Sequence, residues 1–175
     1  MNQAVFLQHI REIPDFPKPG IIFKDITPVF SNPTLCNELT EEFVRMFEGE
    51  RIDAVVGIEA RGFLFGILIA SYLQVPFIPI RKAGKLPYQK ISREYALEYG
   101  VAKIEMHIDA IQPGQRVLLH DDLLATGGSA EAASELIKEV GGELVGLAFL
   151  LNLSFLEGEK RLQRFGVPVK SIARF

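Results

Sequence analysis

The sequence has little of what several classes of protein require. Its single cysteine, Cys36, excludes an internal disulfide and is typical of a reducing compartment. No apolar run approaches the roughly 18 residues of a membrane span, and the opening MNQAVFLQHIREIP lacks the basic-then-apolar order of a secretory signal. A formal net charge of −3 leaves no basic footprint for general nucleic-acid binding. We therefore expect a cytoplasmic protein that binds neither membranes nor nucleic acids.

Motifs for familiar nucleotide and metal sites are missing as well. The chain contains neither GxxxxGK[ST] nor GxGxxG, which excludes the common phosphate loop and the dinucleotide fingerprint. Its histidines and its cysteine form no cluster with aspartate at metal-ligand spacing. We therefore expect no metal site made from side chains alone.

What is present is enough for one domain with a substantial core. The chain has 175 residues, of which 48% are apolar and 23% charged, the balance of an ordinary globular protein. A chain of this length buries roughly 70% of its unfolded surface. The sequence has no internal repeat or low-complexity tract, and we expect residues 1–175 to form a single domain.

Short strand-like runs alternate with helical patterns along the chain. Strands are expected at 54–58, 77–80, 101–109, 116–120 and 144–151, and helices at 3–12, 33–47, 61–74 and 130–140. Residues 14–28, rich in proline, are expected to form a tethered loop. The alternation predicts an α/β fold, a doubly wound and mostly parallel sheet flanked by helices. Ligands of such sheets bind beyond the carboxyl ends of the strands.

A glycine-containing loop follows one of these strands. Its residues Ala125, Thr126, Gly127, Gly128 and Ser129 lead into a helix, whose N-terminus and converging backbone N–H groups favour a phosphate. The preceding Asp121 and Asp122 repel phosphate but suit the hydroxyl groups of a sugar. A ribose 5-phosphate fits both features. The alternative is that Asp122 and Thr126 only shape a tight turn.

A second segment is basic within an acidic chain. Its cations are Arg81, Lys82, Lys85, Lys90 and Arg93, with no acidic residue among them. Gly84 and Pro87 are typical of a mobile flap, and a pyrophosphate leaving group needs cations that close over it and then open. A solvated loop is the alternative interpretation.

Five stretches together resemble one known family. DDLLATGG at 121–128 resembles the phosphoribosyl pyrophosphate (PRPP) signature of the type I phosphoribosyltransferases, in its adenine phosphoribosyltransferase version. The others are PDFPKPGIIFKDITP at 14–28, ARGFLFG at 60–66, IRKAGKLP at 80–87 and YALEYG at 95–100, in the family's order. The resemblance implies the type I phosphoribosyltransferase fold. It also implies an N-terminal arm and purine hood over 1–32 and a flexible flap over 81–100. We expect few apolar anchors over residues 81–95.

The resemblance also implies an activity. The family's adenine branch transfers the phosphoribosyl group of PRPP to adenine and yields AMP and pyrophosphate in purine salvage. Mg²⁺ would accompany PRPP, and the family is generally dimeric, with which the apolar helix at 61–74 is compatible. Two alternatives stay open: transfer to another purine, xanthine or hypoxanthine, and a non-catalytic regulator that senses PRPP.

Residue roles follow from the same resemblance. Arg61, Lys82 and Lys85 would contact the pyrophosphate, Asp121, Asp122 and residues 125–129 would hold the ribose 5-phosphate, and Glu98 with Tyr99 would lie at the reacting centre. Adenine would bind between Phe23 and Leu153, with backbone groups of Ile22 and Lys24 at its edge.

Three local features of the chain bear on the resemblance. Relatives have a non-proline cis peptide in the loop corresponding to 59–62, and we expect it between Ala60 and Arg61. His120 occupies a usually apolar position and is expected to be a half-buried strand residue. Asn152 stands where many relatives carry glutamate, which removes a charge from that position.

Overall fold

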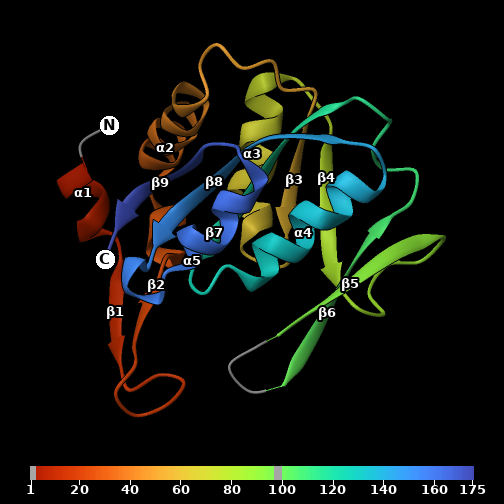
Figure 1. Ribbon diagram of the computed structural model, residues 1–175. Helices are drawn as coiled ribbons and strands as arrows, with labels where there is room; N and C mark the ends of the chain where they lie inside the picture. Colours follow the sequence, from red (N-terminus) through yellow and green to blue (C-terminus); the bar gives the residue numbers. More distant parts are fainter. Residues whose placement is uncertain (1–2, 97–99) are drawn as a thin grey trace.

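A seven-stranded sheet forms the centre of the molecule (Figure 1). The computed structural model describes residues 3–96 and 100–175. The strand order is β5-β6-β4-β3-β7-β8-β9, with β3 (Ala54–Ile58), β4 (Phe77–Lys82), β7 (Arg116–Leu124), β8 (Glu143–Asn152) and β9 (Val169–Arg174) all parallel. Strands β5 (Lys90–Ala96) and β6 (Val101–His107) complete one edge in antiparallel pairing. The prediction of a mostly parallel, doubly wound sheet is confirmed.

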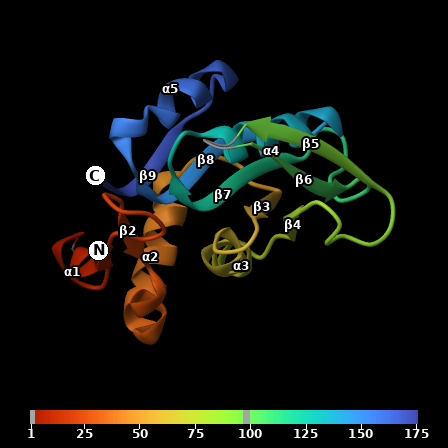
Figure 2. The same cartoon turned by 90° about the horizontal axis from the view of Figure 1, so that it is seen from below.

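Helices cover both faces of the sheet. Seen along the sheet in Figure 2, α2 (Pro33–Met46) and α3 (Gly62–Leu73) lie on one side, and α4 (Gly128–Glu139) and α5 (Gly158–Leu162) lie on the other. The side chain of Asn32 accepts a hydrogen bond from the backbone N–H of Leu35 at 3.1 Å, which caps α2 as its sequence predicts. Strand β3 is buried along its whole length because both of its faces are covered.

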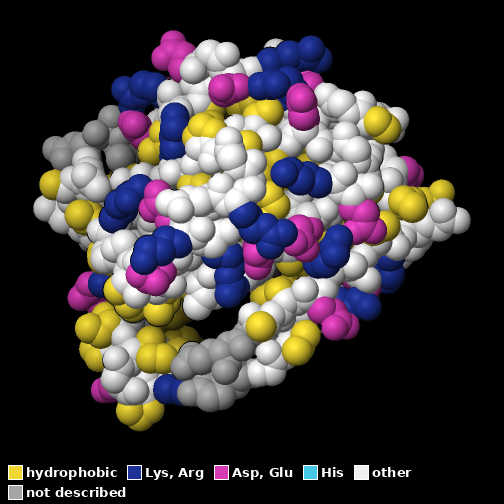
Figure 3. Space-filling model, viewed as in Figure 1, with side chains coloured by type: hydrophobic (Ala, Val, Ile, Leu, Met, Phe, Trp, Pro, Cys, Tyr) yellow, Lys and Arg dark blue, Asp and Glu magenta, His cyan; other side chains and the backbone are white. Residues whose placement is uncertain are grey.

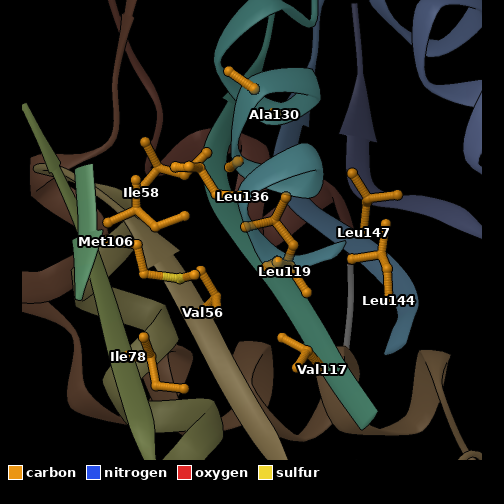
Figure 4. Close-up of a cluster of buried hydrophobic side chains, with 14 of the residues drawn as sticks. Val56, Ile58, Ile78, Met106, Val117, Leu119, Ala130, Leu136, Leu144 and Leu147 are labelled. Atoms are coloured by element: carbon orange, nitrogen blue, oxygen red, sulfur yellow. The ribbon is translucent and has the colours of Figure 1, made fainter. Parts of the chain in front are cut away.

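Two apolar clusters fill the space between these layers. One lies between the sheet and α4, where Val56, Leu119 and Leu136 meet (Figure 4). The other lies between the sheet and the α2–α3 layer and includes Phe43 and Phe65. Together they hold the carboxyl ends of β3, β4 and β7 in a fixed arrangement. None of the described helices is long and apolar enough to cross a membrane.

The N-terminal arm differs from its prediction. Helix α1 (Gln3–Gln8) ends early, and β1 (Arg11–Pro14) pairs with β2 (Ile22–Asp25) as an antiparallel hairpin in the segment expected to be helix and then loop. The prolines between them obscure the period-two pattern, and only pairing across the turn reveals the strands. The described elements also include three short 3₁₀ helices, at Thr27–Ser31, Ser154–Leu156 and Gln163–Phe165.

The basic segment contains a strand that pairs with the edge of the main sheet. Strand β5 pairs with β6 from Lys90↔His107 to Ala96↔Val101, Leu86 is buried, and Ile91 and Tyr95 pack against the core beside α4. The expectation of few apolar anchors was wrong, because Ile91 and Tyr95 share the half-buried face of a strand whose other face carries the exposed Ser92 and Glu94.

Both hairpins extend past the carboxyl ends of the parallel strands, at the bottom of Figure 1. The space-filling view shows a deep notch in the surface between the β1–β2 hairpin and the β5–β6 hairpin (Figure 3). The candidate site residues that follow β3, β4, β7 and β8 lie along this edge of the sheet.

Candidate active site

The two adjacent acids lie within a strand rather than after it. Strand β7 continues to Leu124 because β8 pairs with it as far as Leu124↔Asn152, whereas pairing with β3 ends at Gly57↔His120. The expectation that the strand ends at residue 120 was therefore wrong. Asp121 and Asp122 retain only 9% and 6% of their surface exposed. They are carboxylates held inside the edge of the sheet.

Burial shifts the protonation of both acids. The pKa of Asp121 lies well above its ordinary range because it is buried, and then because the charge of Asp122 is adjacent. Burial also raises the pKa of Asp122, against the opposing effect of Arg61. Tyr95 of β5 responds to the same environment: burial and then the charge of Asp121 raise its pKa. A cluster of this kind is short of hydrogen-bond donors and favours a ligand that supplies them.

Arg61 provides one such donor. Its Nε lies 2.8 Å from Oδ2 of Asp122, and its guanidinium lies 5.2 Å from the centre of the Phe23 ring. Gly62 makes the approach possible, because a Cβ there would stand 2.7 Å from Oδ1 of Asp121 and 3.1 Å from the backbone O of His120. The start of α3 therefore rests directly on the end of β7.

The loop before Arg61 contains the non-proline cis peptide that the resemblance implied. It joins Glu59 to Ala60. The expectation of a cis bond between Ala60 and Arg61 was wrong by one residue.

The predicted phosphate loop has the geometry of an anion site. Gly127 has φ +80° and precedes the first turn of α4. Among the described residues, no protein acceptor takes the backbone N–H groups of Thr126 to Ser129. A cavity of about 190 Å³ lies against the loop, and Tyr95 and Ala96 of β5 form its opposite wall. Free N–H groups at the start of a helix, facing a cavity, can bind a phosphate.

Helix α5 supports this loop from behind. A Cβ on Gly158 would lie 2.2 Å from the O of Ala125 and 2.9 Å from the N of Gly127, so only glycine fits at that contact. Nothing in the local sequence around Gly158 indicates a contact with the phosphate loop. Its importance depends on two segments, about thirty residues apart in the chain, whose backbones touch.

The basic loop is held by acids that sequence reasoning also missed. Glu59 accepts hydrogen bonds from Arg81 and from the backbone N–H of Lys82, and the carboxylate of Glu105 accepts one from the backbone N–H of Gly84. The side chains of Lys82 and Lys85 remain exposed. Glu59 precedes ARGFLFG by one residue and Glu105 lies in a predicted strand, so their positions were visible but their partners were not.

The residues expected to bind a purine lie on two separate elements. Phe23 of β2 meets Phe16 edge to face at 5.2 Å, and Ile22 is exposed. Lys24 pairs with Glu12, and its Nζ lies 4.3 Å from the centre of the Phe175 ring. Leu153 follows β8 and donates its backbone N–H to the O of Leu124 at 2.9 Å. Glu98 and Tyr99 lie outside the described residues, so the structure does not place them.

The two departures from the family pattern are both buried. His120 has no exposed surface, which corrects the half-buried expectation, and its ring meets Phe43 at 4.9 Å and Phe65 at 6.5 Å. Burial lowers its pKa to about 3, so the ring is neutral. Asn152 donates its Nδ2–H to Glu159 at 3.2 Å, while its buried Oδ1 has no partner among the described residues.

These features define a class of protein, an α/β domain with an anion loop and a carboxylate pair at one sheet edge. Residues 29–165 match the model of the phosphoribosyl transferase domain. An adenine phosphoribosyltransferase of Cytophaga hutchinsonii is 50% identical over 166 residues, which is 95% of this chain and 92% of that one.

Solved structures agree with this match. The crystal structure of adenine phosphoribosyltransferase from Thermoanaerobacter pseudethanolicus superimposes with a TM-score of 0.95 at 46% identity, covering 99% of this chain and 100% of that one. The Saccharomyces cerevisiae enzyme, in complex with an imino-altritol bisphosphate and adenine, has a TM-score of 0.91 at 38% identity, with 97% of each chain covered. The chain belongs to the phosphoribosyl transferase family and, within it, to the adenine phosphoribosyltransferases.

Proposed function

We propose that the protein transfers the phosphoribosyl group of PRPP to adenine and releases AMP and pyrophosphate. One observation carries the proposal: the open N–H groups of the loop at 126–129 and the carboxylates of Asp121 and Asp122 belong to one continuous stretch of the same sheet edge. A sugar phosphate needs this combination, because its phosphate accepts hydrogen bonds and its hydroxyls donate them. The adenine bound in the yeast relative supports the choice of purine.

In this reaction the bond between the anomeric carbon and the pyrophosphate oxygen breaks, and a bond from that carbon to a purine nitrogen forms as the nitrogen loses its proton. Residues 125–129 hold the 5′-phosphate, and Asp121 and Asp122 accept hydrogen bonds from the ribose. Those donors favour the ionised form of the carboxylates and so reverse part of the effect of burial. Glu98, with Tyr99 beside it, takes the proton or stabilises positive charge on the sugar.

The leaving group is stabilised by cations. Arg61, Lys82 and Lys85 surround the pyrophosphate, which gains negative charge as the bond breaks. Over residues 3–96 and 100–175 no three His, Cys, Asp or Glu side chains are placed to hold a metal ion together. Mg²⁺ would enter together with PRPP and keep several waters, and Asp121 and Asp122 are the carboxylates that would lie within its reach. When bound it neutralises charge on the leaving pyrophosphate.

The purine lies between Phe23 and Leu153, with the backbone of Ile22 and Lys24 at its edge. A backbone carbonyl facing the 6-position accepts a hydrogen bond from the amino group of adenine but repels the oxygen of a 6-oxo purine. A mismatch of buried polar groups discriminates strongly, so kcat/KM for adenine should exceed that for hypoxanthine by at least about a hundredfold. Xanthine and hypoxanthine transfer is the rival that this ratio tests.

A Mg²⁺-dependent assay with PRPP and a panel of purines tests the whole proposal. AMP formation from adenine supports it, and comparable turnover of hypoxanthine overturns the assignment of the base. The double variant Asp121→Asn with Asp122→Asn is the control, since it should keep a cooperative melt and lose turnover. PRPP binding by calorimetry without turnover of any purine would identify the regulator instead.

The working protein is a homodimer in a reducing cytoplasm. Helix α3 exposes Ile67 at 50% and Tyr72 at 56% of their surface, and Leu64 is exposed beside them, so a second copy is the expected cover of this face. The buried free thiol of Cys36 suits the compartment. Sedimentation of Ile67→Glu should show monomers where wild type shows dimers. Ile108→Glu, which changes an isoleucine of similar exposure, 48%, should stay dimeric.

A further inference from the structure

Glu59 is a carboxylate that lies between the loop of Arg61 and the basic loop of Lys82 and Lys85. Glu59 stands directly after β3, and its oxygens accept hydrogen bonds from Nη2 of Arg81 at 3.0 Å, from Nε of Arg81 at 3.3 Å and from the backbone N–H of Lys82 at 2.9 Å. Its own backbone N–H donates to the O of Ile80 at 2.9 Å. The two-pronged contact with a guanidinium is the most directional ion pair that side chains make.

The contacts of Glu59 extend to the second lysine of the loop. Nη1 of Arg81 donates to the backbone O of Lys85 at 3.1 Å. On the other side of the turn, Glu105 accepts the backbone N–H of Gly84 at 3.0 Å and pairs with Nζ of Lys90 at 3.0 Å. The backbone from Lys82 to Lys85 is thus held by two carboxylates.

The lysine side chains are left available by this arrangement. Among the described residues, neither the Lys82 nor the Lys85 ammonium makes a hydrogen bond or an ion pair, and both side chains are exposed. Hydrogen bonding from Arg81 lowers the pKa of Glu59, so the carboxylate is charged at neutral pH. Arg81 offsets most of this charge at contact distance and the Lys82 ammonium adds only a longer-range attraction, so both ammonium groups remain available to an anion.

Glu59 also adjoins the loop that carries Arg61, two residues further on. We propose that Glu59 is a positioning residue for the pyrophosphate: it fixes, through Arg81 and the Lys82 backbone, the loop that presents Lys82 and Lys85, and couples that loop to Arg61. The proposal rests on the proposed function. It differs from a purely structural role because it concerns one half of the substrate, the pyrophosphate, and leaves the nucleotide half unaffected.

The two ligands of the reverse reaction separate these roles. Pyrophosphate uses the cations, whereas AMP uses the loop at 125–129, the carboxylate pair and the purine hood. For Glu59→Gln we expect the KM of PRPP and of pyrophosphate to rise about tenfold. The Kd of AMP, measured by calorimetry, should stay within about twofold, because AMP has no pyrophosphate group for Lys82 and Lys85 to bind.

A matched control lies at the other end of the same strand. Asp53 directly precedes β3 and, like Glu59, accepts hydrogen bonds from a guanidinium and from a backbone N–H. Its guanidinium contact is single, from Nε of Arg51 at 2.8 Å, where Glu59 has two, and its backbone donor is the N–H of Arg116 at 2.9 Å. Asp53→Asn should therefore lose a similar amount of stability and keep the KM of both pyrophosphate compounds.

Further variants keep the test decisive if Glu59→Gln folds poorly. Arg81→Gln should raise the same KM values, and Arg81→Lys should restore part of the loss. The proposal is overturned if a folded Glu59→Gln or Arg81→Gln binds pyrophosphate like wild type, or if AMP affinity falls in parallel. A failure of the proposed function gives a different result, because the wild-type protein itself would then form no AMP.

Discussion

Arg61 and Asp122 form an ion pair with 2.8 Å between Nε and Oδ2, and this pair joins the loop after β3 to the buried end of β7. The guanidinium is the counter-charge nearest to two carboxylates that burial disfavours as ions. A ligand that brings hydroxyl donors to the carboxylates and anionic oxygens to Arg61 satisfies all three groups at once. The site therefore favours a substrate that has both kinds of group.

Replacing Arg61 tests this arrangement. Arg61→Gln should lower kcat/KM for PRPP about 10²- to 10³-fold, because charge that develops on the leaving group loses a fixed donor. Arg164→Gln is the control, since Arg164 pairs with Glu131 and Glu135 on α4, away from the carboxylate pair. Steady-state kinetics with varied PRPP measures both. A loss of less than about threefold in folded Arg61→Gln would remove this residue from the reaction.

Removing the Asp121 charge should stabilise the ligand-free protein. The pKa of Asp121 is raised above the ordinary 3.8, so the cost to stability is absent below pH 3.8, grows as the pH rises toward the folded-state pKa and is full above it. The free energy of unfolding of Asp121→Asn should exceed that of wild type by about 1 kcal/mol at pH 7, or about 2–4 °C in Tm, and by less at pH 4.5. Turnover with PRPP should fall in the same variant.

Chemical denaturation at the two pH values measures the difference. Asp109→Asn, which changes an exposed carboxylate, should show no such pH-dependent gain. An Asp121→Asn variant that is less stable than wild type at pH 7 would contradict the electrostatic account.

The complete burial of His120 predicts that the protein loses stability in acid. Burial lowers the pKa of His120 from 6.5 to about 3. The protein therefore has its full stability above pH 6.5 and loses stability as the pH falls below 6.5, where the unfolded chain takes up a proton that the folded ring does not. At pH 5.5 this amounts to about 1.4 kcal/mol. His120→Leu has no such group, and its advantage over wild type should grow as the pH is lowered from 7.5 to 5.5. A difference that is constant over this range in urea denaturation would show that His120 does not titrate in unfolding.

The close contact of Gly158 with the phosphate loop predicts that α5 influences phosphate binding. A Cβ there would lie 2.2 Å from the backbone O of Ala125, so Gly158→Ala must displace the loop. We expect AMP affinity to fall about tenfold or more. Gly49→Ala is the control, because Gly49 has φ +89° but no atom within 4 Å of its Cβ position. Gly49→Ala should lose about 1–2 kcal/mol of stability, because its φ is left-handed, and keep AMP affinity. Unchanged AMP binding by folded Gly158→Ala would refute the link.

The sequence by itself determined the class of fold and the chemistry of the site. Apolar runs such as 54–58 are short, β-branched and separated by helical patterns, which defines a parallel sheet because each strand must bury both faces. Asn32 with Pro33 marked the start of α2, as the structure confirms. The loop at 125–129 and its neighbouring acids indicated a phosphorylated sugar, because both the backbone freedom and the charges are local properties of the chain.

Only the tertiary structure decided which groups meet. The strand order β4-β3-β7 brings Arg61 to Asp122 and Glu59 to Arg81, and nothing in the spacing of these residues indicates either pair. The same holds for the β1–β2 hairpin and for Gly158 against Ala125. Periodicity states which face of an element is buried, but not which element covers it. Contacts between distant segments depend on how the layers close, and so do the shifted pKa values of Asp121 and His120, which arise from burial.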